Sequence, residues 1–148
     1  MKQIFFFVPM LLLAAIFNSP NLLAQEEAII VSEGYVRGLP PGVSNTAAFM
    51  RITNNSDTDM VLIGADTPVA ESVTIHATVN DNGMMKMEHQ MTLVIPAKDE
   101  VVLESGGLHL MLMDLKKSLS DEDVQLSLKF SNGLTKSLIL PVINILDE

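Results

Sequence analysis

The sequence contains no cysteine among its 148 residues. This absence excludes disulfides, iron–sulfur clusters, thiol catalysis, covalent haem attachment and blue-copper sites, because each of them needs a cysteine sulfur. A soft metal ion bound by this chain would have to be held by methionine and histidine. Methionine is abundant, with 10 residues, whereas aromatic residues are few, with 6 Phe, 1 Tyr and no Trp.

Positive charge is also scarce. The 9 Lys and Arg residues are outnumbered by 18 Asp and Glu residues, which gives a formal net charge of −9. Nucleic-acid affinity depends largely on clustered Lys and Arg that neutralise phosphates, so this balance excludes nucleic acid as a partner. Hydrophobic residues make up 48% of the chain, which indicates a globular domain rather than a disordered acidic tail.

The N-terminal segment has the features of a secretory signal peptide. Lys2 precedes an apolar run at residues 4–17, and polar residues follow at Asn18 and Ser19. The run is shorter than the roughly 20 residues that cross a bilayer, and an uncleaved membrane anchor is the alternative interpretation. We expect cleavage after Ala24, which removes residues 1–24. Because there is no cysteine for a lipid anchor, we expect a soluble periplasmic product with no stable membrane insertion.

Residues 25–148 are predicted to form a single all-β domain. Short apolar or alternating runs are separated by clusters of Gly, Asn, Asp, Ser and Pro at a spacing typical of a β-sandwich or barrel. No segment has a sustained helical period. We expect about eight to nine strands, near residues 28–36, 46–54, 59–64, 72–79, 84–95, 99–104, 108–114, 124–130 and 135–145.

Methionine and histidine gather in the middle of the chain. Between positions 84 and 113 lie two of the three histidines and the methionines Met84, Met85, Met87, Met91, Met111 and Met113. Residues i and i+2 of a strand share a face, so His109 and Met111 point the same way from the strand expected at 108–114. That strand would offer one nitrogen and one sulfur donor.

A predicted hairpin brings further donors to the same region. The turn signal at residues 81–83 separates His76 from Met87. If the turn is centred on positions 81 and 82, His76 lies opposite Met87. If it is centred on positions 82 and 83, His76 lies opposite His89, and Met87 is its diagonal neighbour. In either register, Met87 and His89 share the face that His76 occupies.

These patterns nominate two imidazoles and two thioethers as metal ligands, namely His76, Met87, His109 and Met111, with His89, Met85 and Met113 in reserve. Thioether sulfur is a soft, neutral donor that binds Cu(I) well and contributes little to Zn, Ca or Mg sites, so the set predicts Cu(I). Methionine also fills irregular cores, and single histidines are often simply hydrogen-bonded. The alternative is therefore an exported, metal-free β-sandwich that serves as a binding or structural module with a methionine-rich core.

The spacing of the candidate ligands resembles a known signature. Ten residues separate His76 from Met87, twenty-one separate Met87 from His109, and Met111 follows in the sequence His109-Leu110-Met111. This resembles the H-x10-M-x21-H-x-M motif of the periplasmic PCu(A)C copper chaperones, and looser similarity extends from about Val36 to Val142.

The resemblance implies a cupredoxin-like Greek-key β-sandwich or barrel that binds Cu(I) near its surface through His76, Met87, His109 and Met111. It also implies delivery of the ion to the copper centre of a haem-copper cytochrome oxidase subunit, with a Sco-type thiol copper protein as a further partner. Some relatives carry a His- and Met-rich tail, which this chain lacks, so we expect one copper per chain. We expect a monomer and no enzyme activity, because the sequence contains no nucleophile elbow or phosphate-binding glycine loop.

Overall fold

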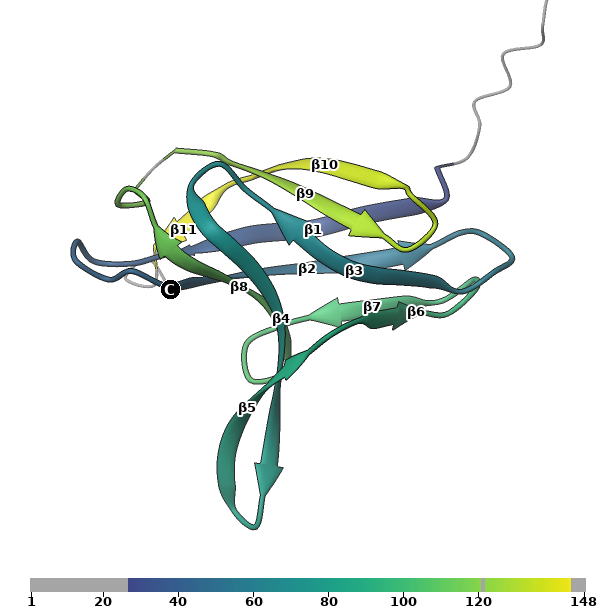
Figure 1. Ribbon diagram of the computed structural model, residues 1–148, viewed down its shortest axis with the longest axis horizontal. Helices are drawn as coiled ribbons and strands as arrows, with labels where there is room; N and C mark the ends of the chain where they lie inside the picture. The colour runs from purple at the N-terminus through teal and green to yellow at the C-terminus, as the bar shows by residue number, and fades with distance from the viewer. Residues whose placement is uncertain (1–26, 121, 145–148) are drawn as a thin grey trace, which may run out of the picture.

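The computed structural model describes residues 27–120 and 122–144, so the predicted signal peptide lies outside the described residues (Figure 1). The described chain is all-β, with no helix, which confirms the predicted fold class. This part of the protein therefore contains no helix that is long and apolar enough to span a membrane. The strands are β1 (Ile29–Gly38), β2 (Thr46–Asn54), β3 (Met60–Asp66), β4 (Ala70–Asp81), β5 (Met84–Gln90), β6 (Leu93–Ile95), β7 (Glu100–Leu103), β8 (Leu108–Leu115), β9 (Val124–Phe130), β10 (Thr135–Leu140) and β11 (Val142–Asn144).

The strand count exceeds the expected eight to nine because two predicted strands are each divided. The segment expected at 84–95 forms β5, which pairs with β4, and β6, which pairs with β3. The segment expected at 135–145 is divided at Pro141 into β10, which pairs with β9, and β11, which runs parallel to β1. Proline has no N–H to donate to a ladder, so a change of partner at this residue sacrifices no hydrogen bond.

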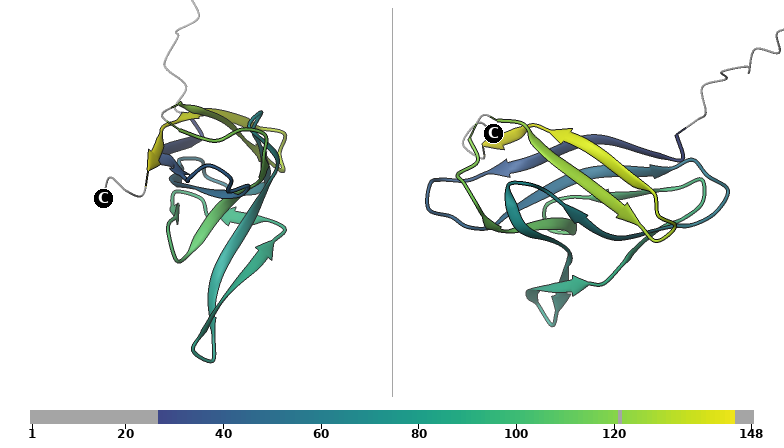
Figure 2. Two further views of the ribbon diagram at one scale, coloured as in Figure 1. Left: turned by 90° about the vertical axis from the view of Figure 1, so that its left-hand side faces the viewer. Right: turned by 45° about the horizontal axis from the view of Figure 1, so that its top comes forward.

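The strands form one hydrogen-bonded ladder that folds back on itself. Its order is β10-β9-β3-β4-β8-β2-β1-β11, with β5, β6 and β7 attached to β4, β3 and β2. Contacts between β1 and β10, which lie near opposite ends of this order, bring the two layers of the sandwich together. Viewed end on, the strands curve around a common interior, whereas the β4–β5 hairpin extends away from the body (Figure 2, left).

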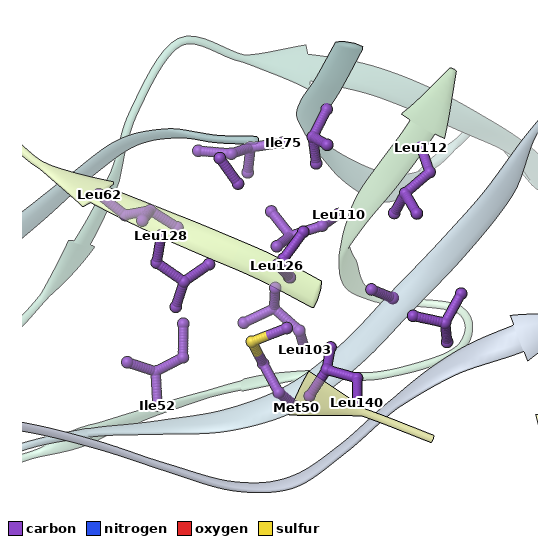
Figure 3. Close-up of a cluster of buried hydrophobic side chains, with 14 of the residues drawn as sticks. Met50, Ile52, Leu62, Ile75, Leu103, Leu110, Leu112, Leu126, Leu128 and Leu140 are labelled. Atoms are coloured by element: carbon purple, nitrogen blue, oxygen red, sulfur yellow. The ribbon is translucent and has the colours of Figure 1, made fainter. Parts of the chain in front are cut away.

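The core between the layers is built from aliphatic side chains, several of which Figure 3 shows pointing toward one another. On β4 and β8, the side chains that enter it include Ile75, Leu110 and Leu112, at 2%, 0% and 0% exposure. Full burial of such a side chain stabilises the fold by about 1.5–3 kcal/mol. Because a strand alternates its faces, the residues between these anchors point away from the core.

The β4–β5 turn is centred on Asn82 and Gly83. Both have positive φ, 52° and 88°, and Asp81 pairs with Met84 across the turn. A two-residue turn with positive φ at both central positions suits the right-handed twist of a hairpin, and Asn-Gly is its preferred sequence. Of the two registers that the sequence left open, the one centred on positions 82 and 83 is therefore confirmed.

Candidate metal centre

The three histidines lie side by side on adjacent strands. His76 of β4 pairs with His89 of β5 on one side and with His109 of β8 on the other. The ring centroids of His76 and His89 are 5.6 Å apart, and those of His76 and His109 are 5.8 Å apart. Directly paired residues of antiparallel strands project from the same face. The three imidazoles therefore form a row across one face, with His76 in the middle.

The two methionine ligands expected from the sequence lie on the same face. Met87 pairs with Thr78, two residues beyond His76 on β4, and Met111 pairs with Thr74, two residues before it. The register with His76 directly opposite Met87 is thus wrong, and Met87 is a diagonal neighbour of His76. All four first-choice candidates project from the face of β5, β4 and β8 that is turned away from the leucine core.

Three of the four candidates also line one cavity of about 290 Å³, namely Met87, His109 and Met111. His76 is not among the lining residues, and it lies beside the cavity with its ring stacked on that of His109. The cavity therefore gives space in which an imidazole nitrogen and two thioether sulfurs can approach one ion. Its other walls come from the β1–β2 region, from β4 and from the β7–β8 loop: Arg37, Leu39, Val43, Asn45, Thr46, Ala47, Phe49, Thr78, Ser105 and Gly106.

Sequence reasoning missed these other walls. Phe49 packs beside the His109 ring at a centroid distance of 6.4 Å, and the Arg37 guanidinium lies 5.0 Å from the centre of the Phe49 ring. No residue spacing indicated them, because they reach the site through the pairing of β2 with β8. Only their aromatic and cationic chemistry, rare in this chain, could have singled them out.

One hydrogen bond fixes the tautomer of the His109 ring. The side chain is 4% exposed, and its Nδ1 lies 3.1 Å from the Gly107 carbonyl oxygen. Because a carbonyl only accepts, Nδ1–H donates to it, and Nε2 keeps its lone pair. A backbone carbonyl that fixes the tautomer in this way is the usual support for a metal-binding histidine.

His76 has a buried nitrogen without a protein partner. Its Nε2 lies 3.0 Å from the Thr74 hydroxyl oxygen, whereas Nδ1 is buried and has no hydrogen-bond partner in the described part of the chain. When Nε2–H donates to Thr74, the lone pair of Nδ1 is free to bind a metal. An orphaned buried nitrogen between two other imidazoles fits a ligand position.

Burial lowers the pKa of His76 below its ordinary value of 6.5, and positive charge on His109 and His89 lowers it further. The neutral ring is therefore the favoured form at neutral pH, and the neutral imidazole is the form that binds metal. Burial and the neighbouring rings thus prepare His76 for a ligand role without any acidic partner.

The reserve candidates are placed differently from one another. His89 and Met85 are exposed on β5, on the same face as Met87. Met113 lies on β8 opposite Ser72, farther along the strand from His109 than Met111 is. Within residues 27–120 and 122–144, no three His, Asp or Glu side chains are arranged to hold a metal ion together. The donors that meet here are mixed nitrogen and sulfur.

Comparison with known proteins assigns the chain to a family. A family model described as LpqE-like, a lipoprotein family, matches residues 29–142. The chain belongs to the LpqE-like family. A protein of Leifsonia xyli subsp. xyli named as a lipoprotein is 33% identical to this LpqE-like chain over 120 residues, which are 80% of this chain and 71% of that protein. An uncharacterized protein of Rickettsia prowazekii is 26% identical over 132 residues, covering 86% and 73% of the two chains.

Solved structures agree with this assignment. The solution structure of CuI-DR1885 from Deinococcus radiodurans superposes on the LpqE-like chain with a TM-score of 0.64 and 37% identity, covering 80% of this chain and 82% of that one. The copper-bound PCuAC domain from PmoF2 has a TM-score of 0.68 at 19% identity, covering 79% and 93%. The family resemblance and the cupredoxin-like fold class predicted from the sequence are confirmed, whereas the individual ligands stay predictions.

The lowered pKa of His76 predicts that the copper-free protein loses stability in mild acid. In the unfolded chain this ring titrates near 6.5. Just below that pH, the unfolded chain therefore binds more protons than the folded one. The stability present above 6.5 is lost as the pH falls toward the lower folded-state pKa. Between about pH 7.5 and about pH 5, wild type should lose more unfolding free energy than His76→Gln, measured by urea denaturation.

The exposed ring of His89 provides the control. His89→Gln should keep most of the wild-type loss, because burial is the largest cause of the shift at His76 and His89 the smallest. Equal losses in wild type and His76→Gln would show that the ring at position 76 does not carry this pH dependence.

Proposed function

We propose that this protein is a periplasmic Cu(I) chaperone that binds one Cu(I) through His76, Met87, His109 and Met111. The observation that carries the proposal is the convergence of these four side chains on one face of three adjacent strands, three of them lining the same cavity. The Deinococcus radiodurans structure titled CuI-DR1885, at 37% identity, supports the choice of ion.

The chemistry of the donor set favours Cu(I) over harder ions. Thioethers are neutral and soft, and they stabilise the reduced ion, whereas Zn, Ca and Mg favour thiolate or oxygen donors. The free nitrogens, Nε2 of His109 and Nδ1 of His76, add two neutral donors. Four neutral ligands leave a single positive charge on the Cu(I) complex, less than a divalent ion would leave.

The burial of the donors suits a carrier. His109 is 4% exposed, Met111 is partly buried, and Met87 is 57% exposed. An acceptor can therefore displace Met87 from the ion while the buried donors still hold it. Cu(I) passes from protein to protein by such ligand exchange, in which one bond to the metal forms as another breaks.

The positions of the methionines weaken the metal-free alternative. The buried methionines of the core are Met50 and Met60, at 2% and 5% exposure. Met84, Met85, Met87 and Met91 are instead 57–79% exposed. Core filling is therefore wrong for these four residues. Two of them, Met85 and Met87, share the face of His76 and present their thioethers to solvent, where a soft ion can bind them.

Copper binding is tested by titrating the purified residues 25–148 with Cu(I) in competition with a Cu(I) chelator, followed by X-ray absorption. We expect one Cu(I) per chain, with sulfur and nitrogen in its coordination shell, because thioethers and imidazoles are the donors available. A shell of only oxygen and nitrogen, or no uptake against the chelator, would refute the proposal.

A matched pair of methionine variants tests the ligand assignment. Met111→Leu removes a sulfur donor and roughly conserves volume, so it should cost less than about 1.5 kcal/mol of stability. Its Cu(I) affinity should fall at least about tenfold, the scale at which even outer-shell changes act. Met50→Leu makes the same change in the core and should leave affinity unchanged. Equal Cu(I) affinities in the two variants would show that Met111 is not a ligand and only packs against its neighbours.

We propose the copper centre of a haem-copper cytochrome oxidase subunit as the acceptor, with a Sco-type thiol copper protein as a second partner, on the strength of the family resemblance. Mixing the Cu(I)-loaded protein with the copper-free soluble copper domain of the oxidase subunit should move the ion to the acceptor. Size-exclusion chromatography with metal analysis would follow it. If the Cu(I)-loaded protein retained all of its copper, the oxidase subunit would not be the acceptor.

A further inference from the structure

We propose that Met85 and His89, on either side of Met87 along β5, form an outer transfer site through which Cu(I) reaches and leaves the centre. The inference rests on the proposed function and extends it. It concerns the route of the ion rather than a second resident copper.

The register of β4 and β5 sets these donors in line. Met85, Met87 and His89 pair with Asn80, Thr78 and His76, so they occupy alternate positions of one strand and share one face. The other face is marked by the ion pair between Lys86 Nζ and Glu88 Oε1, 3.5 Å apart. Sulfur, sulfur and nitrogen therefore follow one another along the face that leads to His76.

The donors on β5 are more exposed than those on β8. Met85 is 63% exposed and Met87 57%, whereas Met111 is partly buried and His109 is 4% exposed. Figure 1 shows β5 and the distal half of β4 extending away from the sandwich. An ion arriving from solvent or from another protein can reach Met85 without entering the cavity that Met87, His109 and Met111 line.

The geometry permits the ion to pass between neighbouring donors. Alternate residues of a strand lie about 7 Å apart, and the three rotatable bonds of each methionine let both sulfurs approach one ion. Cu(I) remains Cu(I), each step forms one bond from metal to donor while another breaks, and the thioethers carry no proton to release. Met87 belongs to both sets, so it can hold the ion while Met85 leaves and His109 takes its place.

Transfer kinetics test this route. Cu(I) loading from a weak Cu(I) complex and removal by a chelator are followed by stopped flow for wild type, Met85→Leu and Met84→Leu. Met84 is the matched control, because it is the adjacent residue, is 73% exposed and lies on the Lys86 side of β5. Met85→Leu should slow loading and removal by about tenfold each, because a barrier common to both directions has risen. Met84→Leu should match wild type in both rates.

The ratio of the two rates separates a route from a ligand. A residue on the route changes both rates by a similar factor, so the Kd moves much less than either rate. Adding His89→Gln to Met85→Leu should slow both directions further. Rates equal to those of Met84→Leu would overturn the proposal, and so would a Kd weakened in step with a faster removal rate. Failure of wild type to bind Cu(I) at all would instead refute the proposed function.

Discussion

The alternation of side chains along β4 and β8 is the constraint on which the site depends. Ile75, Leu110 and Leu112 face the core, and the residues adjacent to them in sequence, His76, His109 and Met111, must face the other way. A slip of one residue would carry every side chain of a strand to the opposite face. Such a slip would expose leucines that are fully buried, so the hydrophobic core fixes the register. The core thereby aligns the candidate ligands on the opposite face.

The sequence predicted much of this arrangement because its signals are local. Turn residues and alternation located the strands, and the Asn82-Gly83 dipeptide indicated the hairpin register that the structure has. Spacing within β8 placed His109 and Met111 on one face before any pairing was known. Each of these inferences needs only a few neighbouring residues and the two-residue period of a strand.

What the sequence left open depends on pairings between distant segments. The division of β5 from β6, and of β10 from β11, follows from a change of partner strand, which no local pattern records. The wall of the cavity is similar, because Phe49 reaches His109 only through the pairing of β2 with β8. The buried, unpartnered Nδ1 of His76 also becomes visible only when β5 and β8 flank β4 on both sides.

One feature that costs stability, and another that adds little, occur on β4 and β5. A buried polar atom without a partner costs about 1–3 kcal/mol, and each exposed methionine forgoes part of the about 1.5–3 kcal/mol that burial would supply. His76 Nδ1 therefore acts against folding in the metal-free chain, and the methionines of β5 contribute little to folding. In the proposed Cu(I) complex, the ion would take the lone pair of His76 Nδ1 and the exposed sulfur of Met87 as ligands. The leucine core compensates for this cost in the metal-free protein, so the fold does not depend on the candidate ligands being covered.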